Sequence, residues 1–554
     1  MQRRICMKKE NSLLKAGVVL VVSGFIVKLL GALYRIPLTR MLGAAQMGRY
    51  SALFSLFMPF FSFATAGIVP CTAHFSAAAR GSKAVASVGS KSALLYIFQS
   101  SVMAVCFVCF GCFYSYIQSD SIFFTGSIIL APAIVLAAAE NICKGLTQGQ
   151  MDMLPTAVSN VLESTAKTVL GLSGVYFAAQ LGKQGDGMVK AALGAVTVAG
   201  FICCAFLLFT VRKKICNKMA AGSTVSTGNV LEKVYILPSE TIIGEKTAKT
   251  VSVRQMLGMS FPIAVSALVI SLSAFFDTAV CIPRIDGIPY SDIVKSFEGA
   301  SFKNAENMPM YLLGIYQGMV LTVFNLLPAV LSYIGTASLP VISRAAAAED
   351  KTQLKWHTAR IFTVTASVSV PVTVFIYFFR YDILQMLFGT NAAQTQVSAK
   401  LLGILLWGSV FCCFTSVFNS VLYAAGRSAL VFRILLLASA VKCMLNYILC
   451  GIPQINIKAF AVSACIFNTI IFVLSVINIK KLGAAFSFGK IFFMPCAAAA
   501  LSMGVLWLVN DSALCFLPPV LKLAFSAAIF ALVYFLIAII TGFMLISVPE
   551  NSNI

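Results

Sequence analysis

The sequence predicts an all-α polytopic membrane protein with about fourteen transmembrane helices. Of its 554 residues, 59% are hydrophobic and only 11% are charged, and the mean hydropathy is +0.91. Runs of about 20 mostly apolar residues, the length a helix needs to cross the hydrocarbon layer, recur throughout the chain. Backbone polar groups inside lipid must be bonded within the segment itself, so these runs are expected to be helices.

The expected spans follow one another with short connections. They lie near 13–36, 47–78, 84–117, 121–147, 154–180, 187–211, 254–282, 309–345, 358–379, 397–424, 429–450, 457–479, 489–509 and 520–547.

We expect two lobes of six helices each. Residues 1–212 hold the first six spans and 251–481 the next six, with a polar stretch at 213–250 that reads as a cytoplasmic connector. Residues 482–554 add two further helices and a tail.

A weak internal repeat supports two lobes. The segment TAKTVLGLSGVYFA around Lys167 is similar to AVKCMLNYILCGIP around Lys442, and each places one lysine at the start of an apolar run. Repeats of this kind are common in transporters. The two halves are expected to run in the same direction across the membrane.

The net charge of +22 is distributed like that of a membrane protein rather than a nucleic-acid-binding one. With the amino terminus in the cytoplasm, the 41 Lys and Arg residues divide into 26 on the inner side, 12 on the outer side and 3 within spans. This inner excess follows the positive-inside rule. We therefore expect a multi-pass protein of the cytoplasmic membrane with both termini in the cytoplasm, and no nucleic acid as partner.

The residues needed for metal binding, disulfide frameworks and nucleotide hydrolysis are scarce or missing in the sequence. There are only two histidines, and the 17 cysteines are scattered through apolar segments, so neither a metal site nor a disulfide framework is expected. No GxxxxGK[ST] motif is present, so nucleotide hydrolysis is not expected to drive the protein. We expect no enzyme activity and no cofactor beyond a coupling Na⁺ or H⁺.

Charged residues inside the expected spans are the candidate functional residues. Lys28 and Arg35 lie seven residues apart on one face of the first span. A positive charge at bilayer depth is costly unless it faces water or a counter-charge, so the pair is a binding-site hypothesis. Two structural alternatives stay open: Arg35 reaching the headgroups, and Lys28 neutralised by an acidic neighbour.

The remaining intramembrane charges divide into pairs and single groups. Glu163 and Lys167 are four residues apart, which favours an intrahelical ion pair. Lys442 has no acid three or four residues away, and so needs water, another helix or an anion. Asp277 is expected either to bind a coupling cation or proton or to pair with a lysine.

Glu140 and Lys144 close the fourth expected span, where we expect them to lie at the membrane interface.

The order of motifs resembles a known superfamily over nearly the whole chain. The first half carries KLLGALYRIPLTRMLGAAQMGRY, FATAGIVPCTA and KGLTQGQMDMLPTAVSNVLE, and the second carries FPIAVSALVISLSAFFDTAVCIPR, LLGIYQGMVLTVFNLLPAVL and VKCMLNYILCGIPQINIKAFA. These segments resemble the stage V sporulation protein B and polysaccharide-biosynthesis branch of the multidrug/oligosaccharidyl-lipid/polysaccharide (MOP) exporter superfamily. The chain is also similar to lipid II flippases.

The resemblance implies a fold and a task. It implies two MATE-like lobes around a central cavity, and a flippase that moves an undecaprenyl-pyrophosphate-linked saccharide, such as lipid II or a related peptidoglycan or polysaccharide precursor, by alternating access. In this branch the flippase activity is tied to sporulation and to cell-wall synthesis, which implies cell-wall synthases as partners.

The resemblance also suggests roles for residues. Lys28, Arg35 and Lys442 would bind the anionic headgroup, because ammonium and guanidinium groups replace the hydration of a diphosphate. Asn446 matches a position that resembles a sodium-site asparagine, and Asp277 would join it. Two alternatives stay open: a cation-coupled multidrug antiporter, and a non-transporting membrane scaffold of cell-wall synthesis.

Overall fold

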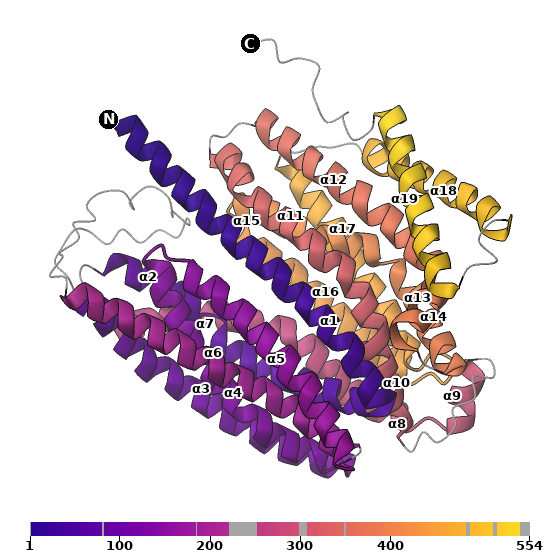
Figure 1. Cartoon of the computed structure of the whole chain (residues 1–554), viewed down its shortest axis with the longest axis horizontal. Helices are drawn as coiled ribbons and strands as arrows, with labels where there is room; N and C mark the ends of the chain where they lie inside the picture. Colours follow the sequence, from indigo (N-terminus) through magenta and orange to yellow (C-terminus); the bar gives the residue numbers. More distant parts are fainter. Residues whose placement is uncertain are drawn as a thin grey trace. The chain divides into compact units, whose positions relative to one another are not determined.

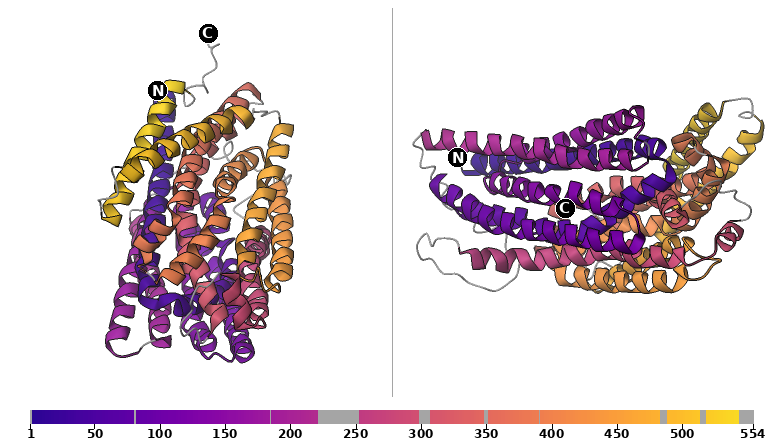
Figure 2. Two further views of the ribbon diagram at one scale, coloured as in Figure 1. Left: turned by 90° about the vertical axis from the view of Figure 1, so that its right-hand side faces the viewer. Right: turned by 90° about the horizontal axis from the view of Figure 1, so that it is seen from below.

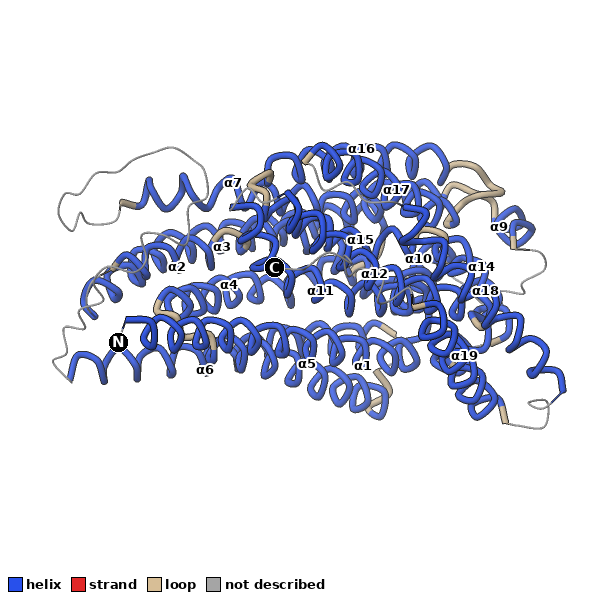
Figure 3. The backbone as a smooth tube through the Cα atoms, turned by 90° about the horizontal axis from the view of Figure 1, so that it is seen from above, coloured by secondary structure: helices blue, strands red, loops and turns tan. Residues whose placement is uncertain are grey.

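The computed structural model describes most of the chain and is helical throughout the part it describes. The described residues are 2–79, 82–183, 185–220, 252–297, 307–347, 351–389, 391–482, 488–512 and 518–542. Their helices are joined by short loops (Figures 1 and 3). Most of the expected connector, residues 221–250, lies outside this part.

The elements are α1 (Gln2–Thr65), α2 (Ile68–Ala78), α3 (Ser82–Gln118), α4 (Ile122–Gly149), α5 (Leu154–Gln180), α6 (Asp186–Ala220), α7 (Val253–Phe276), the π-helical η2 (Asp277–Cys281), α8 (Ile282–Asp286), α9 (Tyr290–Ser296), α10 (Met308–Gly314), the π-helical η3 (Ile315–Val320), α11 (Leu321–Ala347), α12 (Lys351–Phe378), α13 (Arg380–Phe388), α14 (Ala392–Leu406), α15 (Ser409–Ala424), α16 (Ser428–Cys450), α17 (Lys458–Lys481), α18 (Phe488–Ser512) and α19 (Pro519–Thr541).

The membrane-length helices confirm the predicted fold class. Among the described residues, 11 helices are long and apolar enough to cross a membrane, or 12 if the bent pair α14 and α15 forms one span. The first two expected spans fall in one helical run, Val22–Ala78, which explains part of the difference from fourteen. Helix α5 fills the fifth expected span but is less apolar, with Glu163 and Lys167 in its middle.

Contacts divide the chain into two compact units. The first unit is 1–34 with 49–279, and the second is 35–48 with 280–554. We expected α7 to begin the second lobe, but it groups with the first unit. Two contacts explain this: the Phe275 and Phe110 rings lie 5.0 Å apart between their centroids, and the Tyr114 hydroxyl donates to the Thr278 carbonyl at 3.0 Å. The lobe boundary at residue 251 stays a prediction.

The first unit is a bundle in which α4 is central. Helices α3 and α6 both pack on α4, and α5 packs on α6, so that these helices run alongside one another (Figures 1 and 2). Between α2, α3, α4 and α6 lies an apolar core that includes Ile68, Val88, Ala138 and Leu207. Because α4 contacts helices on several sides, much of its surface is buried inside the unit.

The second unit is built around a phenylalanine core. Phe362, Phe414 and Phe418 are each about 1% exposed and pack at centroid distances of 5.0 to 5.8 Å. The two last helices belong to this unit, because α18 and α19 pack on α12. The Tyr534 hydroxyl of α19 donates to the Ser367 carbonyl of α12 at 2.9 Å.

The segment 35–48 of α1 lies in the second unit because of glycine contacts. Gly43 breaks the helix with φ of 73° and ψ of 172°, a conformation open to glycine. A Cβ atom on Gly48 would lie 1.8 Å from the Met310 carbonyl oxygen, and one on Gly314 would lie 1.7 Å from that of Ala44. Small residues allow backbones in membranes to approach this closely, so the segment is held against α10 by shape.

Candidate functional site

Lys28 is an exposed cation on an apolar helix of the first unit. The lysine is exposed, while the next positions pack α1 against α5. Ser164 of α5 donates to the Val27 carbonyl at 3.5 Å, and the Tyr34 ring fills the space above Gly171, where a Cβ would lie 2.7 Å away. Helices α1 and α5 therefore run side by side, with Val27 next to Ser164 and Tyr34 next to Gly171. In this register Lys28 lies on an exposed side of the helix pair.

Lys167 lies on the same helix pair, against aromatic rings. Its ammonium nitrogen is 5.1 Å from the centre of the Phe54 ring and 5.6 Å from that of Tyr34. The Tyr34 and Tyr50 hydroxyls lie 3.5 Å apart in the same place. Cation–π contacts of this kind stabilise a positive charge where water is scarce.

Arg35 is held by the carbonyls of a widened helical turn in the second unit. Its Nη2 donates to the Gln317 carbonyl at 2.8 Å, and Gln317 lies in the π-helical η3. Thr39, one turn on, donates to the Gly318 carbonyl at 3.4 Å. A π-helical turn displaces carbonyls from the regular ladder, and here side chains from residues 35–48 bind them. A headgroup-binding role for Arg35 stays a prediction.

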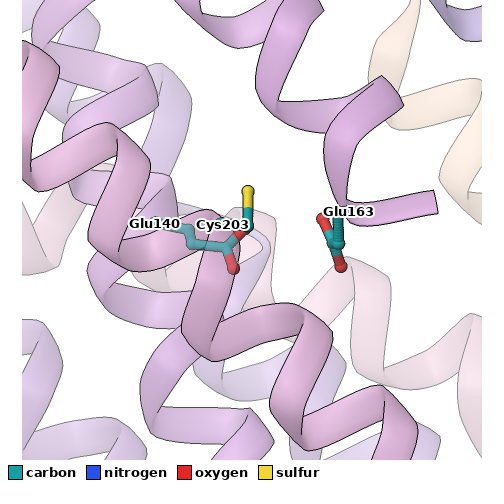
Figure 4. Close-up of side chains that lie close together, drawn as sticks. All are labelled: Glu140, Glu163 and Cys203. Atoms are coloured by element: carbon teal, nitrogen blue, oxygen red, sulfur yellow. The ribbon is translucent and has the colours of Figure 1, made fainter. Parts of the chain in front are cut away.

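A cluster of charged groups lies inside the first unit, and Figure 4 shows its two carboxylates, Glu140 and Glu163, with the nearby Cys203. The ammonium of Lys144 donates to Glu140 Oε2 at 3.1 Å on α4 and lies 3.8 Å from Glu163 Oε2 on α5. The Cys203 thiol of α6 donates to the Ser159 carbonyl at 3.4 Å. Single ligand atoms of Glu140, Glu163 and Cys203 lie within 4.8 Å of one another.

The cluster places Glu140 and Lys144 in the interior of the helix bundle, and their expected position at the membrane interface stays a prediction. Glu140 is 3% exposed and Lys144 8% exposed, because α4 is covered on both sides by other helices of the unit. The cluster also gives Glu163 a partner other than the expected one: it meets Lys144, whereas Lys167 is directed at the rings. The spacing of four residues between Glu163 and Lys167 could not reveal the contact with Lys144, because sequence spacing carries no information about neighbouring helices.

Arg49 joins three segment ends that sequence reasoning did not connect. Its Nε lies 2.9 Å from Asp120 Oδ2, between α3 and α4, and its Nη1 donates to Asp186 Oδ1 at 3.0 Å, at the start of α6. A signal for this contact was present, because the expected topology places all three residues at the same end of their spans. The guanidinium is therefore a clamp at that end of the bundle.

The two residues expected to bind a coupling ion fall in different contact units. Asp277 begins the π-helical η2 in the first unit and is buried, at 9% exposed. Asn446 in the second unit is fully buried, and its Oδ1 accepts a short hydrogen bond from Ser463 of α17. Lys442, one turn before Asn446 on α16, is half-buried. Roles in ion and headgroup binding stay predictions for these residues.

Comparison with known families identifies the chain. The family model described as polysaccharide biosynthesis protein matches residues 13–346, more than half of the sequence. The chain belongs to the polysaccharide biosynthesis protein family. The MatE family model also matches this polysaccharide biosynthesis protein, over residues 317–448.

Two kinds of relative agree with this assignment. Stage V sporulation protein B of Bacillus subtilis (strain 168) is 21% identical over 474 residues, which cover 82% of this chain and 81% of that protein. The structure titled lipid II flippase MurJ in an inward closed conformation has a TM-score of 0.67 at 14% identity, covering 96% of this chain and all of that one. An inward-facing multidrug resistance MATE transporter of the MOP superfamily has a TM-score of 0.59 at 13% identity, covering 85% of this chain and all of that one.

The comparisons establish the fold of this polysaccharide biosynthesis protein as MurJ- and MATE-like and the chain as a multi-pass membrane protein.

Proposed function

We propose that this protein is a flippase that moves an undecaprenyl-pyrophosphate-linked saccharide, such as lipid II or a related wall or polysaccharide precursor, across the cytoplasmic membrane. The observation that carries the proposal is Lys28, an exposed cation on an apolar span in a chain whose fold matches a lipid II flippase over 96% of its length. An exposed ammonium at bilayer depth is stable only beside water or an anion. A diphosphate headgroup is such an anion.

The mechanism follows from where the charges must travel. The diphosphate and its sugar cross past Lys28 while the polyprenyl chain stays in the bilayer, and the two units alternate access to the two sides. The membrane potential acts on the anionic cargo by about 2.3 kcal/mol per elementary charge per 100 mV. A cation gradient is the other available energy source. Both termini lie in the cytoplasm, where cell-wall synthases would supply or consume the precursor.

Lys28 supplies the test. The protein is reconstituted in liposomes with a fluorescent undecaprenyl-pyrophosphate-linked saccharide, and exposure of the label on the opposite leaflet is followed by membrane-impermeant quenching. Lys28→Gln is expected to lower the translocation rate at least tenfold, and Lys28→Arg to retain most of it. Arg433→Gln, which removes an exposed cation from α16, is the matched control and is expected to behave as wild type.

A multidrug antiporter is the second candidate, because the MatE model matches residues 317–448. It predicts efflux of cationic dyes from the same liposomes. Wild-type translocation by Lys28→Gln would overturn the headgroup role of Lys28. Dye transport without precursor transport would replace the flippase by the antiporter, and neither activity would favour the scaffold.

A further inference from the structure

The charged cluster of the first unit has one more carboxylate than it has ammonium groups. Glu140 and Glu163 approach the same Lys144, at 3.1 and 3.8 Å. One ammonium neutralises one carboxylate, so the trio carries an excess negative charge when both acids are ionised. In a membrane-spanning bundle such a charge is costly unless a proton or a cation compensates it.

In the part of the chain that the structure describes, Lys144 is the cation that lies within ion-pair distance of these two carboxylates. Glu140 has Cys143 of α4 and Cys203 and Cys204 of α6 as thiol neighbours, and Cys71 of α2 and Tyr96 of α3 lie in the same apolar core as Cys143 and Cys203. Thiols and phenols are neutral near neutral pH.

Among the described residues, Lys28 of α1 and Lys167 of α5 make no ion pair with Glu140 or Glu163. Lys167 lies one turn beyond Glu163 on α5, and its ammonium lies against the rings of Tyr34 and Phe54. On α1, Lys28 is exposed. The excess charge of the cluster is therefore a property of Glu140, Lys144 and Glu163 together.

A proton suits this donor set better than a metal ion does. Glu140, Glu163 and Cys203 bring three ligand atoms within 4.8 Å of one another, but the Lys144 ammonium stands hydrogen-bonded at 3.1 Å from the same Glu140 carboxylate. A metal cation bound there would lie beside a fixed positive charge, which repels it strongly in a low dielectric. A proton compensates the excess charge without that repulsion, since it binds to one carboxylate oxygen.

The two acids differ in access. The Glu140 side chain is 3% exposed, whereas that of Glu163 is 45% exposed. Glu140 is thus fixed in its pair with Lys144, and Glu163 is the group that a proton can reach and leave. We propose that Glu140, Lys144 and Glu163 form a proton-binding site that exchanges one proton through Glu163, separate from Asp277 and Asn446. Its coupling to transport rests on the proposed flippase function.

Proton binding is measured first, without transport. The purified full-length protein in lipid nanodiscs is titrated while infrared difference spectroscopy follows the C=O stretch of protonated carboxyl groups. As the pH falls, wild type is expected to gain a band that is absent in Glu163→Gln, because the amide leaves a neutral Glu140–Lys144 pair. Asp152→Asn is the matched control, since Asp152 pairs with Lys214 outside the cluster, and it is expected to keep the band.

Transport is measured second, in the liposome assay. Translocation with a more acidic medium outside the liposomes is compared with translocation at equal pH on both sides. Wild type is expected to respond to the gradient and Glu163→Gln to lose the response. A carboxyl band unchanged in Glu163→Gln would overturn the proton site even if precursor is still translocated. A band lost in Glu163→Gln, in a protein that translocates no precursor, would support the proton site and overturn the flippase. Translocation whose gradient response survives Glu163→Gln would overturn the coupling.

Discussion

The side chain of Arg35 supports the widened turn η3. Its hydrogen bond to the Gln317 carbonyl spans 282 residues of sequence, and the bonded carbonyl lies in a turn whose own ladder is displaced. A charge-assisted hydrogen bond that is removed leaves a half-buried carbonyl without its donor. Arg35 is thus a structural residue whether or not it also meets the cargo.

We expect Arg35→Gln to lower the free energy of unfolding by about 1.5 to 3 kcal/mol, because a hydrogen bond from a charged donor is lost. The measurement is the midpoint of thermal unfolding in detergent, followed by size-exclusion chromatography. Arg433→Gln removes an exposed cation and is expected to shift the midpoint little. Equal midpoints for the two variants would show that the bond to Gln317 contributes nothing.

Individual residues also show what sequence reasoning could reach. Lys28 was identified as a charge on an apolar face, and spacing within one helix was enough for that. The partner of Glu163 was not, because Lys144 is on another helix and the choice between Lys144 and Lys167 depends on how α4 and α5 pack. For Arg49, the expected topology places Asp120 and Asp186 at the same end of the bundle, but it does not say that their side chains meet.

Among the elements, the contact between the segment 35–48 and α10 is the tightest steric feature. Gly48 and Gly314 face the backbone of the opposing helix, and the carbonyl oxygens of Met310 and Ala44 lie where Cβ atoms would stand. Helix–helix association in lipid depends on close packing, because apolar side chains gain little by leaving lipid for protein. A methyl group at either position must push the two backbones apart.

We expect Gly48→Ala to destabilise the protein by about 1 to 3 kcal/mol or to prevent its accumulation, since added volume in a packed contact forces the backbone to shift. Gly31→Ala is the matched control on the same helix, because nothing lies within 4 Å of its added Cβ. It is expected to be neutral or to stabilise by up to about 1 kcal/mol. Expression level and thermal midpoint in detergent are compared. Similar losses in both variants would contradict the role of the close approach.

At the scale of the elements, hydrophobicity predicts the spans, and each coincides with helical structure as far as the described residues reach; residues 543–547 of the last span lie outside them. It could not place the helix breaks, because these depend on Gly43 and on the widened turns η2 and η3. Breaks of this kind reflect the tertiary partners of a helix more than its own composition.

For the whole molecule, charge distribution predicts orientation. Under the positive-inside rule, the division into 26 inner and 12 outer Lys and Arg residues predicts that both termini lie in the cytoplasm. The Arg49 contacts bring together the segment ends near residues 49, 120 and 186, which the alternating spans place on one side of the membrane in either orientation.

We expect green fluorescent protein fused after the carboxyl terminus to fluoresce, because it folds in the cytoplasm, and alkaline phosphatase at the same place to be inactive. Alkaline phosphatase fused after Ser119, in the turn between α3 and α4, is expected to be active. The two reporters are compared at matched expression levels. The opposite pattern would reverse the orientation and with it the direction assigned to transport.

The position of residues 35–48 in the second unit has a consequence for biosynthesis. The carbonyls and glycine that receive this segment, at Met310, Gly314 and Gln317, leave the ribosome more than 260 residues after it. While the first half is being inserted, the packing partners of this segment have not been synthesised, and the carbonyl that Arg35 binds is also absent. Packing of this segment is therefore a late event of translation, and the two halves of this chain, made as separate polypeptides, would leave the segment without its packing partners.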